Sequence, residues 1–257
     1  MRHPGGEAAP SVVDRVVSVL ESCAGSSHGL TLVDLVARTG LPKTTLHRVC
    51  WKLVELGLLT HAEDGFRIGT KLFALGSMNP DLRRLRAAAM PHLYELMTRT
   101  GWATNLAVLA DGRALVVEEV FGGQTRVMPR MVGARLPLHA TAIGKVLLSG
   151  YDDEALDAYL AAGVLRPYTR TTVVRVNLLR EQLEAVRRGG VAFSHEEWAI
   201  GTCGVAAPVM VRDAIVASVA VVGSPGEAAL RQRADAVRAA ALGIGRALSP
   251  MSAAVAA

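Results

Sequence analysis

Residues 43–52 are rich in basic and hydroxyl-bearing side chains. Arginine and lysine can bond to guanine or to phosphate, and threonine can bond to a base edge or a phosphate. Such residues occur here before any acidic side chain. A helix of this make-up is typical of DNA recognition. We expect base-edge or nearby backbone contacts from Lys43, Thr44, Thr45 and His47, and phosphate contacts from Arg48 and Lys52.

The residues before this segment predict the turn that would present it. Thr31 stands three residues before Asp34, which is the spacing of a capping box at a helix start. Gly40 suits the positive φ of a helix end, and Pro42 suits the first position of the next helix. The pattern therefore predicts a helix-turn-helix. An ordinary pair of amphipathic helices with a solvated basic face stays open, as does a role for Arg48 in bracing the helix pair through an ion pair.

A hairpin is predicted directly after the second helix. Residues 57–60 and 65–69 suit two short strands, and Asp64-Gly65 supplies the turn signal. A helix-turn-helix followed by a hairpin is a winged helix. Arg67 would contact phosphate from the wing or remain a solvated strand residue. Cys50 and Trp51 are expected in or near the core.

Composition limits the other classes of protein. The chain has 257 residues, 51% hydrophobic and 4% aromatic, with a net charge of +5. This charge suits a polyanion partner. Three scattered cysteines suit reduced thiols rather than disulfides, and there is no uncharged apolar run of 18 residues. We therefore expect a cytoplasmic protein that does not enter a membrane.

The pattern of helices and strands predicts an α+β chain in several parts. A flexible N-terminus (1–10) precedes the winged helix-turn-helix domain (11–78) and a linker helix (79–100), which Pro91 should kink or split. From Gly101 a hairpin around Asp111-Gly112 and strands at 191–196, 203–211 and 214–223 predict an antiparallel sheet. Helices are expected at 141–149, 152–161, 177–189 and 225–248. This second domain covers 101–249, and a flexible tail covers 250–257.

Neither a catalytic nor a metal site is predicted. His139, Glu196, Glu197 and Cys203 lack the spacing of zinc ligands, and Cys203 with His139 lacks a third residue to orient the base. Residues 133–145 do not form a phosphate-binding loop. Instead, Thr141 would cap a helix over 142–149, whose first amide groups would suit a carboxylate. The alternative is a tight loop that only shapes the domain.

Three segments together resemble the IclR family of transcription regulators. They are GLPKTTLHRVCWKLVELGLL, GARLPLHATAIGK, and GVAFSHEEWAIGTCGVAAPV with the later ASVAVVGSP. The resemblance spans roughly residues 11–248. It implies a winged helix, a linker helix and a C-terminal effector-binding domain resembling the GAF fold. It also implies a homodimer, or a dimer of dimers, on a double-stranded DNA operator.

The resemblance also implies a set of pocket residues. Members that bind small keto acids place an acidic residue where Ser194 stands, hydroxyl groups where Val221 and Gly223 stand, and a cysteine where Gly204 stands. Loss of these polar partners predicts a small organic effector that is larger or more apolar, such as an aromatic one, or no small effector at all. The implied effector-binding positions are Thr125, Met128, Leu136, Ala142, Ile143, Ser194, Gly204, Val221 and Gly223.

The sequence thus predicts a DNA-binding regulator without a cofactor, whose operator affinity changes when an effector binds the C-terminal domain. One alternative is an effector-independent regulator in which that domain serves only oligomerisation. Another is a small-molecule enzyme or sensor that uses its winged helix for protein contacts.

Overall fold

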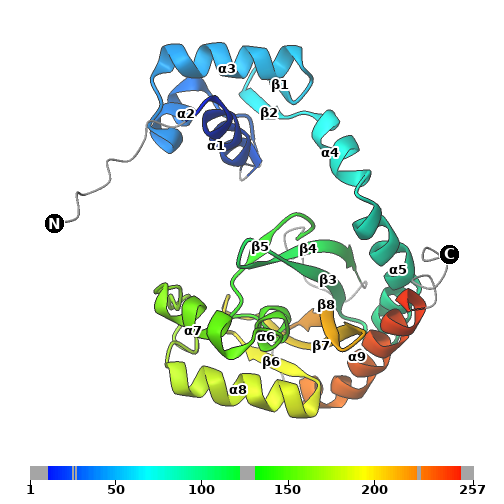
Figure 1. The fold of residues 1–257 in the computed structure, drawn as a ribbon. Coiled ribbons are helices and arrows are strands. Elements are labelled where there is room, and N and C mark those ends of the chain that lie inside the picture. The colour runs from blue at the N-terminus through cyan, green and yellow to red at the C-terminus, as the bar shows by residue number, and fades with distance from the viewer. Residues whose placement is uncertain (1–10, 25, 27, 122–130, 225–226, 250–257) are drawn as a thin grey trace. The chain divides into compact units, whose positions relative to one another are not determined.

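The computed structural model describes residues 11–24, 26, 28–121, 131–224 and 227–249 (Figure 1). The chain divides into two compact units between Pro80 and Asp81. No helix in these described segments is long and apolar enough to cross a membrane. The first unit contains α1 (Val12–Ala24), α2 (Leu32–Thr39), α3 (Lys43–Glu55), β1 (Leu59–Ala62), β2 (Gly65–Ile68) and α4 (Thr70–Ser77).

The turn between α2 and α3 follows the predicted chemistry with one shift. Thr31 and Asp34 form a capping box, and Gly40 ends α2 with a φ of 68°. Both predictions are confirmed. Pro42 is the N-cap of α3 rather than its first residue, and its carbonyl accepts a bond from the Leu46 amide (3.0 Å). The fixed φ of proline still prepares the chain for the helix from this position.

The first strand of the wing begins two residues later than predicted, and the turn of the wing is tighter. Residues 61 and 62 belong to β1, and Ala62 pairs with Gly65 across a turn at 63–64. Leu30 pairs with Phe66 and adds a third short stretch to the hairpin. Gly65 has a φ of 120°, and a Cβ there would clash with the Leu30 carbonyl, so glycine is required at this position.

The second unit is built on a six-stranded antiparallel sheet in the order β5-β4-β3-β8-β7-β6. Its helices are α5 (Pro80–Thr100), α6 (Ala142–Ser149), α7 (Asp153–Ala161), α8 (Val176–Gly189) and α9 (Glu227–Leu248). Its strands are β3 (Ala103–Ala110), β4 (Arg113–Val120), β5 (Arg135–Leu136), β6 (Ala192–His195), β7 (Cys203–Val211) and β8 (Ala214–Gly223). The α+β prediction is confirmed.

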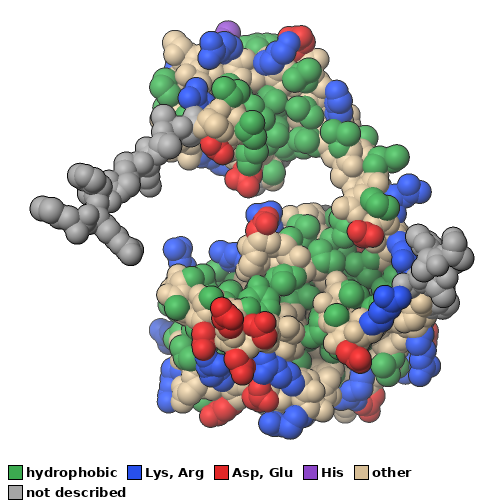
Figure 2. All heavy atoms as spheres, viewed as in Figure 1, with side chains coloured by type: hydrophobic (Ala, Val, Ile, Leu, Met, Phe, Trp, Pro, Cys, Tyr) green, Lys and Arg blue, Asp and Glu red, His purple; other side chains and the backbone are tan. Residues whose placement is uncertain are grey.

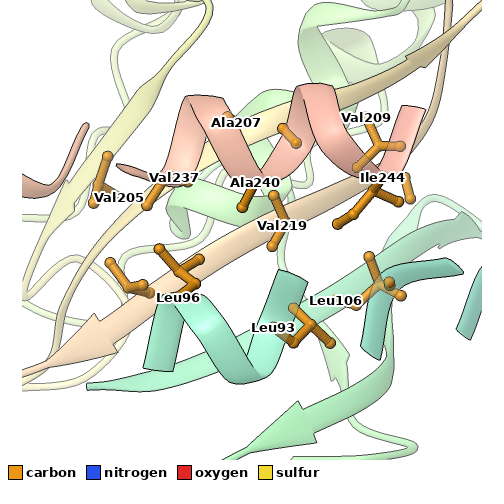
Figure 3. Close-up of a cluster of buried hydrophobic side chains, with 14 of the residues drawn as sticks. Leu93, Leu96, Leu106, Val205, Ala207, Val209, Val219, Val237, Ala240 and Ile244 are labelled. Atoms are coloured by element: carbon orange, nitrogen blue, oxygen red, sulfur yellow. The ribbon is translucent and has the colours of Figure 1, made fainter. Parts of the chain in front are cut away.

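Two separate cores cover the two faces of this sheet. On one face, side chains of α5 and α9 pack against alternate residues of the strands (Figure 3). Leu93 and Leu96 come from α5, Val237 and Ile244 from α9, and Val219 from β8. On the other face, α6, α7 and α8 form a second cluster. Successive strand residues point to opposite faces, so β8 contributes Val219 to the first core and Ala220 to the second.

The linker helix α5 runs through Pro91 as one helix, so Pro91 does not split it. Leu85 and Ala89 before the proline and Leu93 and Leu96 after it are all buried in the same core. Burial of the apolar face on both sides holds the two halves together and offsets the hydrogen bond that proline cannot make.

Helix α6 is buried along its whole length. Thr141 caps it, as predicted, because the Thr141 hydroxyl accepts a bond from the Gly144 amide (3.1 Å). Gly144 has no space for a side chain, since a Cβ there would lie 2.5 Å from the Leu138 Cα. The helix start is therefore held tightly against residues 137 and 138.

Candidate functional site

The exposed face of α3 carries the residues predicted to meet DNA. Lys43, Thr44, His47 and Arg48 are exposed, whereas Thr45 is partly buried. Thr45 lines a surface groove with residues of α1, including Arg15 and Val16. The structure thus separates Thr45 from the outward positions. Figure 2 shows basic side chains on this unit beside an extended patch of hydrophobic ones.

The charged residues of this unit differ in their ion-pair partners. Lys52 forms an exposed ion pair with Glu55 (2.7 Å). Arg48 makes no ion pair within the described part of the chain, so nothing there supports the bracing role. Arg67 on the wing pairs with Asp64, whose other bond is from the Gly29 amide (2.7 Å). These hydrogen bonds lower the pKa of Asp64 to about 2, and the pair stays charged at neutral pH.

Trp51 is the one residue of α3 whose position was predicted wrongly. Its exposed fraction is 43%, and it follows Thr44 by seven residues on the same helix face. The indole ring contacts His61 of β1, with ring centroids 5.0 Å apart, and Phe66 of β2, at 5.8 Å. Trp51 therefore joins the helix to the wing. The helical spacing from Thr44 would have revealed its outward position.

The second unit contains a small cavity of about 50 Å³ on the α6 side of the sheet. Five predicted positions line it: Leu136, Ala142, Ile143, Ser194 and Gly204. The predicted Thr125 and Met128 lie outside the described residues. Lining residues that sequence reasoning missed are Asn105, Met131, Thr141, Trp198, Thr202, Ala220 and Val222.

Neither position predicted on the last strand, Val221 or Gly223, lines this pocket. Val221 is fully buried in the core with α5 and α9, on the opposite face of the sheet. Gly223 lies against the Trp102 ring, which would clash with a Cβ. The pocket is instead lined by Ala220 and Val222. A shift of one residue moves a strand side chain to the other face. The two residues of β8 that line the pocket, Ala220 and Val222, therefore carry no hydroxyl group.

Polar groups enter the pocket from the start of α6. The amides of Ala142 and Ile143 belong to the first helical turn, where no intrahelical acceptor exists. Within the described residues neither amide has a hydrogen-bond partner, whereas the Gly144 and Lys145 amides bond to Thr141. The Ser194 hydroxyl bonds to the Ala140 carbonyl (3.3 Å). Both residues line a pocket whose surface is largely apolar.

A buried ion pair links α6 to the loop that follows β6. The Lys145 ammonium donates to Glu197 Oε1 (2.6 Å) and to the Phe193 carbonyl (3.3 Å). Burial lowers the pKa of Lys145, and the Glu197 carboxylate opposes this effect. Glu197 directly precedes Trp198, which lines the pocket. Sequence reasoning missed this pair, because 52 residues separate its members.

The structure does not assemble the catalytic pair considered from the sequence. Cys203 Sγ lies 3.8 Å from His195 Nδ1, and the cysteine is buried in the core with α5 and α9. His139 Nε2 instead bonds to the Arg166 carbonyl (3.0 Å). Burial lowers the pKa of His139, which favours its neutral form. No group of three or more candidate metal-binding side chains occurs in the segments that the structure describes.

Comparison with known proteins agrees with this architecture. Residues 12–63 match the IclR helix-turn-helix domain, and residues 81–249 match the bacterial transcriptional regulator IclR C-terminal domain. The transcriptional repressor IclR of Escherichia coli (strain K12) is 31% identical over 209 residues, covering 78% of this chain and 76% of that protein. The glycerol operon regulatory protein of Streptomyces coelicolor is 32% identical over 199 residues, covering 77% and 78%.

Solved structures give the same result. An IclR homologue from Microbacterium hydrocarbonoxydans, complexed with 4-hydroxybenzoate, has a TM-score of 0.83 and 29% identity, covering 93% of this chain and 99% of that one. The Thermotoga maritima IclR has a TM-score of 0.70 and 26% identity, with 92% and 98% covered. These relatives are regulators and not enzymes. The chain therefore belongs to the IclR family and is a DNA-binding transcription regulator.

Proposed function

We propose that a small organic acid binds in the pocket of the second unit and changes the affinity of this regulator for its operator. The observation that carries the proposal is the pair of unpartnered amides, Ala142 and Ile143, at the start of a buried helix that lines an apolar pocket. Helix N-termini favour anions through these amides and the helix dipole. A carboxylate at this position would satisfy both groups.

The walls indicate the rest of the ligand. Leu136, Ile143, Trp198, Ala220 and Val222 present apolar surface. Because Ala220 and Val222 carry no hydroxyl group, a compact and strongly hydrated keto acid would lose water contacts that this wall of the pocket cannot replace. An aromatic acid suits the site better. The complex of the Microbacterium homologue with 4-hydroxybenzoate supports this choice.

Ligand binding in the pocket and DNA binding by the first unit are then thermodynamically linked. The ligand changes DNA affinity by the difference between its affinities for the DNA-binding arrangement and for the other arrangement of the protein. We propose that the acting species is a homodimer or a dimer of dimers on a double-stranded operator. A regulator whose second unit only assembles the oligomer is the alternative, and it would bind operator identically with and without acid.

Narrowing the pocket tests the effector site. A Cβ at Gly204 would lie 3.7 Å from the Ala142 Cβ and from the Val222 side chain, so Gly204→Ala should fold normally. The added methyl group takes space from the ligand, and overpacking costs about 1–3 kcal/mol. We expect benzoate to bind the variant at least about tenfold more weakly by calorimetry.

The matched control is Gly189→Ala, because a Cβ at Gly189 meets no atom within 4 Å. This variant should bind benzoate as the unchanged protein does. Fluorescence anisotropy on the protein's own upstream DNA, with and without benzoate, then measures the coupling. Equal benzoate affinity for both variants would place the ligand elsewhere. Benzoate binding without any change in operator affinity would favour the assembly-only alternative.

Two substitutions on α3 separate base contacts from phosphate contacts. Thr44 and Arg48 are both exposed on α3. Thr44→Ala should weaken operator binding by about 1–3 kcal/mol and leave random duplex unaffected. Arg48→Ala should weaken both duplexes alike and reduce the salt slope by about 1. Anisotropy at several salt concentrations measures both effects.

The control for charge is Arg188→Ala, which removes an exposed arginine from α8 of the second unit. It should leave both the affinity and the salt slope unchanged. If Thr44→Ala and Arg48→Ala also bind like the unchanged protein, the exposed face of α3 is not the DNA-reading surface.

A further inference from the structure

Aromatic rings of the first unit form a row that runs from α3 to the wing. Trp51 lies in the middle, with its ring centroid 6.3 Å from that of His47 on the same helix and 5.0 Å from that of His61 on β1. The His61 ring lies 4.7 Å from the ring of Phe66 on β2, which is buried in the core of this unit. His47, Trp51 and His61 are exposed, and we call these three rings the ring row.

The ring row continues the face of α3 that carries Thr44 and Arg48. Trp51 follows Thr44 by seven residues and Arg48 by three, and residues at these spacings share a helix face. The core residues Leu46 and Cys50 lie on the opposite face. At a rise of 1.5 Å per residue, Trp51 lies about 10 Å beyond Thr44 along the helix. This length corresponds to about three base pairs of a duplex.

The charges around the ring row favour a polyanion as its partner. Arg48 and Lys52 are exposed beside it on α3, and Arg67 is exposed on the wing. The nearby acids are already paired, since Glu55 binds Lys52 and Asp64 binds Arg67. An apolar protein surface would bury these cations without new partners, which is unfavourable. Phosphate groups on both sides of a DNA groove would instead pair with them.

The rings themselves match a different part of the duplex. An indole ring presents a large apolar surface with one N–H group at its edge. In the major groove, the apolar group that distinguishes one base from the others is the C5 methyl of thymine. Because His61 and Phe66 hold the Trp51 ring from the wing side, little side-chain freedom remains to be lost when it meets DNA.

We propose that Trp51 is a specificity-determining residue of the operator complex, and that its ring packs against the C5 methyl of a thymine in the major groove. This thymine lies about three base pairs from the position that Thr44 contacts. The inference rests on the DNA-reading role proposed for the exposed face of α3. It adds an apolar contact, made between the helix and the wing, to the hydrogen bonds proposed for Thr44.

Replacement of thymine by uracil tests the inference on the unchanged full-length protein, because deoxyuridine lacks only the C5 methyl. Anisotropy compares duplexes of the protein's own upstream region in which one thymine at a time is replaced. We expect one replacement to weaken binding about fourfold, as for one buried methyl group. Trp51→Ala should bind this duplex and the thymine duplex equally. A variant that still distinguishes them, or a series without any such thymine, would overturn the proposal.

Two further variants show whether the ring is the cause. Trp51→Ala should weaken operator binding at least about tenfold and random duplex much less, whereas Trp51→Phe keeps a ring and should lose less. Tyr94→Ala is the matched control, because it removes an exposed ring from α5 of the second unit and should leave operator binding unchanged. If Thr44→Ala weakens operator binding and Trp51→Ala does not, this inference fails alone. If neither does, the DNA-reading role of α3 fails with it.

Tryptophan fluorescence decides the question even if Trp51→Ala folds poorly. The chain has three tryptophans, and the other two, Trp102 and Trp198, lie in the second unit. Saturating operator should protect part of the emission of the unchanged protein from quenching by acrylamide. Trp51→Phe should lose this protection while it still binds operator. Protection that persists in Trp51→Phe, or no protection at saturation, would place the ring row outside the DNA interface.

Discussion

Replacement of Lys145 by methionine should destabilise the second unit by about 3–5 kcal/mol, because it leaves the Glu197 carboxylate buried without its cation. The Lys145 side chain is 1% exposed and the Glu197 side chain 7%. Glu197 Oε2 already has no hydrogen-bond partner, and loss of the lysine would remove the partner of Oε1 as well. Scanning calorimetry should show the transition of this unit at a markedly lower temperature.

Two further variants make the result specific to the buried pair. Lys52→Met removes a lysine from an ion pair whose side chains are 59% and 66% exposed, and exposed pairs contribute about 0–1 kcal/mol. The double replacement Lys145→Met with Glu197→Leu removes both buried charges, so it should be more stable than Lys145→Met alone. A double variant that is less stable than either single one would mean that the pair itself stabilises the fold.

Because Glu197 directly precedes Trp198, the ion pair also positions one wall of the pocket. Lys145→Met should therefore weaken benzoate binding even under conditions where the variant is fully folded. The polar groups of the loop support the same position, since the Thr172 hydroxyl donates to the Glu197 carbonyl (2.6 Å). Neither Lys145 nor Glu197 lines the pocket, so we expect the pair to act on binding only through the position of Trp198.

The substitution Gly144→Ala should also unfold or strongly destabilise the second unit, by about 3 kcal/mol, the upper range for overpacking. Its Cβ would lie 2.5 Å from the Leu138 Cα and 2.6 Å from the carbonyl oxygens of Pro137 and Leu138. These are backbone atoms, which cannot rotate away as a flexible side chain could. The start of α6 would have to move, and the pocket amides would move with it. Denaturant unfolding and benzoate titration measure the two effects.

Helix propensity alone would make Gly144→Ala stabilising, because alanine favours a helix over glycine by about 1 kcal/mol. Gly76→Ala is the matched control within α4, where a Cβ meets no atom within 4 Å. It should be neutral or slightly stabilising. If Gly144→Ala were equally well tolerated, the close packing of α6 on residues 137 and 138 would be wrong.

The sequence by itself determined the local elements of this protein. The caps at Thr31 and Thr141, the positive φ at Gly40 and the turn at Asp111-Gly112 all follow from the conformations that those residues favour. Caps and turns depend on neighbours within a few residues, so their chemistry can be read directly. The basic face of α3 was predicted for the same reason, because helical spacing is local.

Only the tertiary structure decided which side chains share the pocket. Val222, and not Val221, faces it, because strand register reverses with a shift of one residue. Trp51 remains 43% exposed although its ring contacts His61 and Phe66 of the wing. The partnership of Lys145 with Glu197 joins segments far apart in the chain. Burial and hydrogen-bond satisfaction are properties of the packed structure, and no local pattern specifies them.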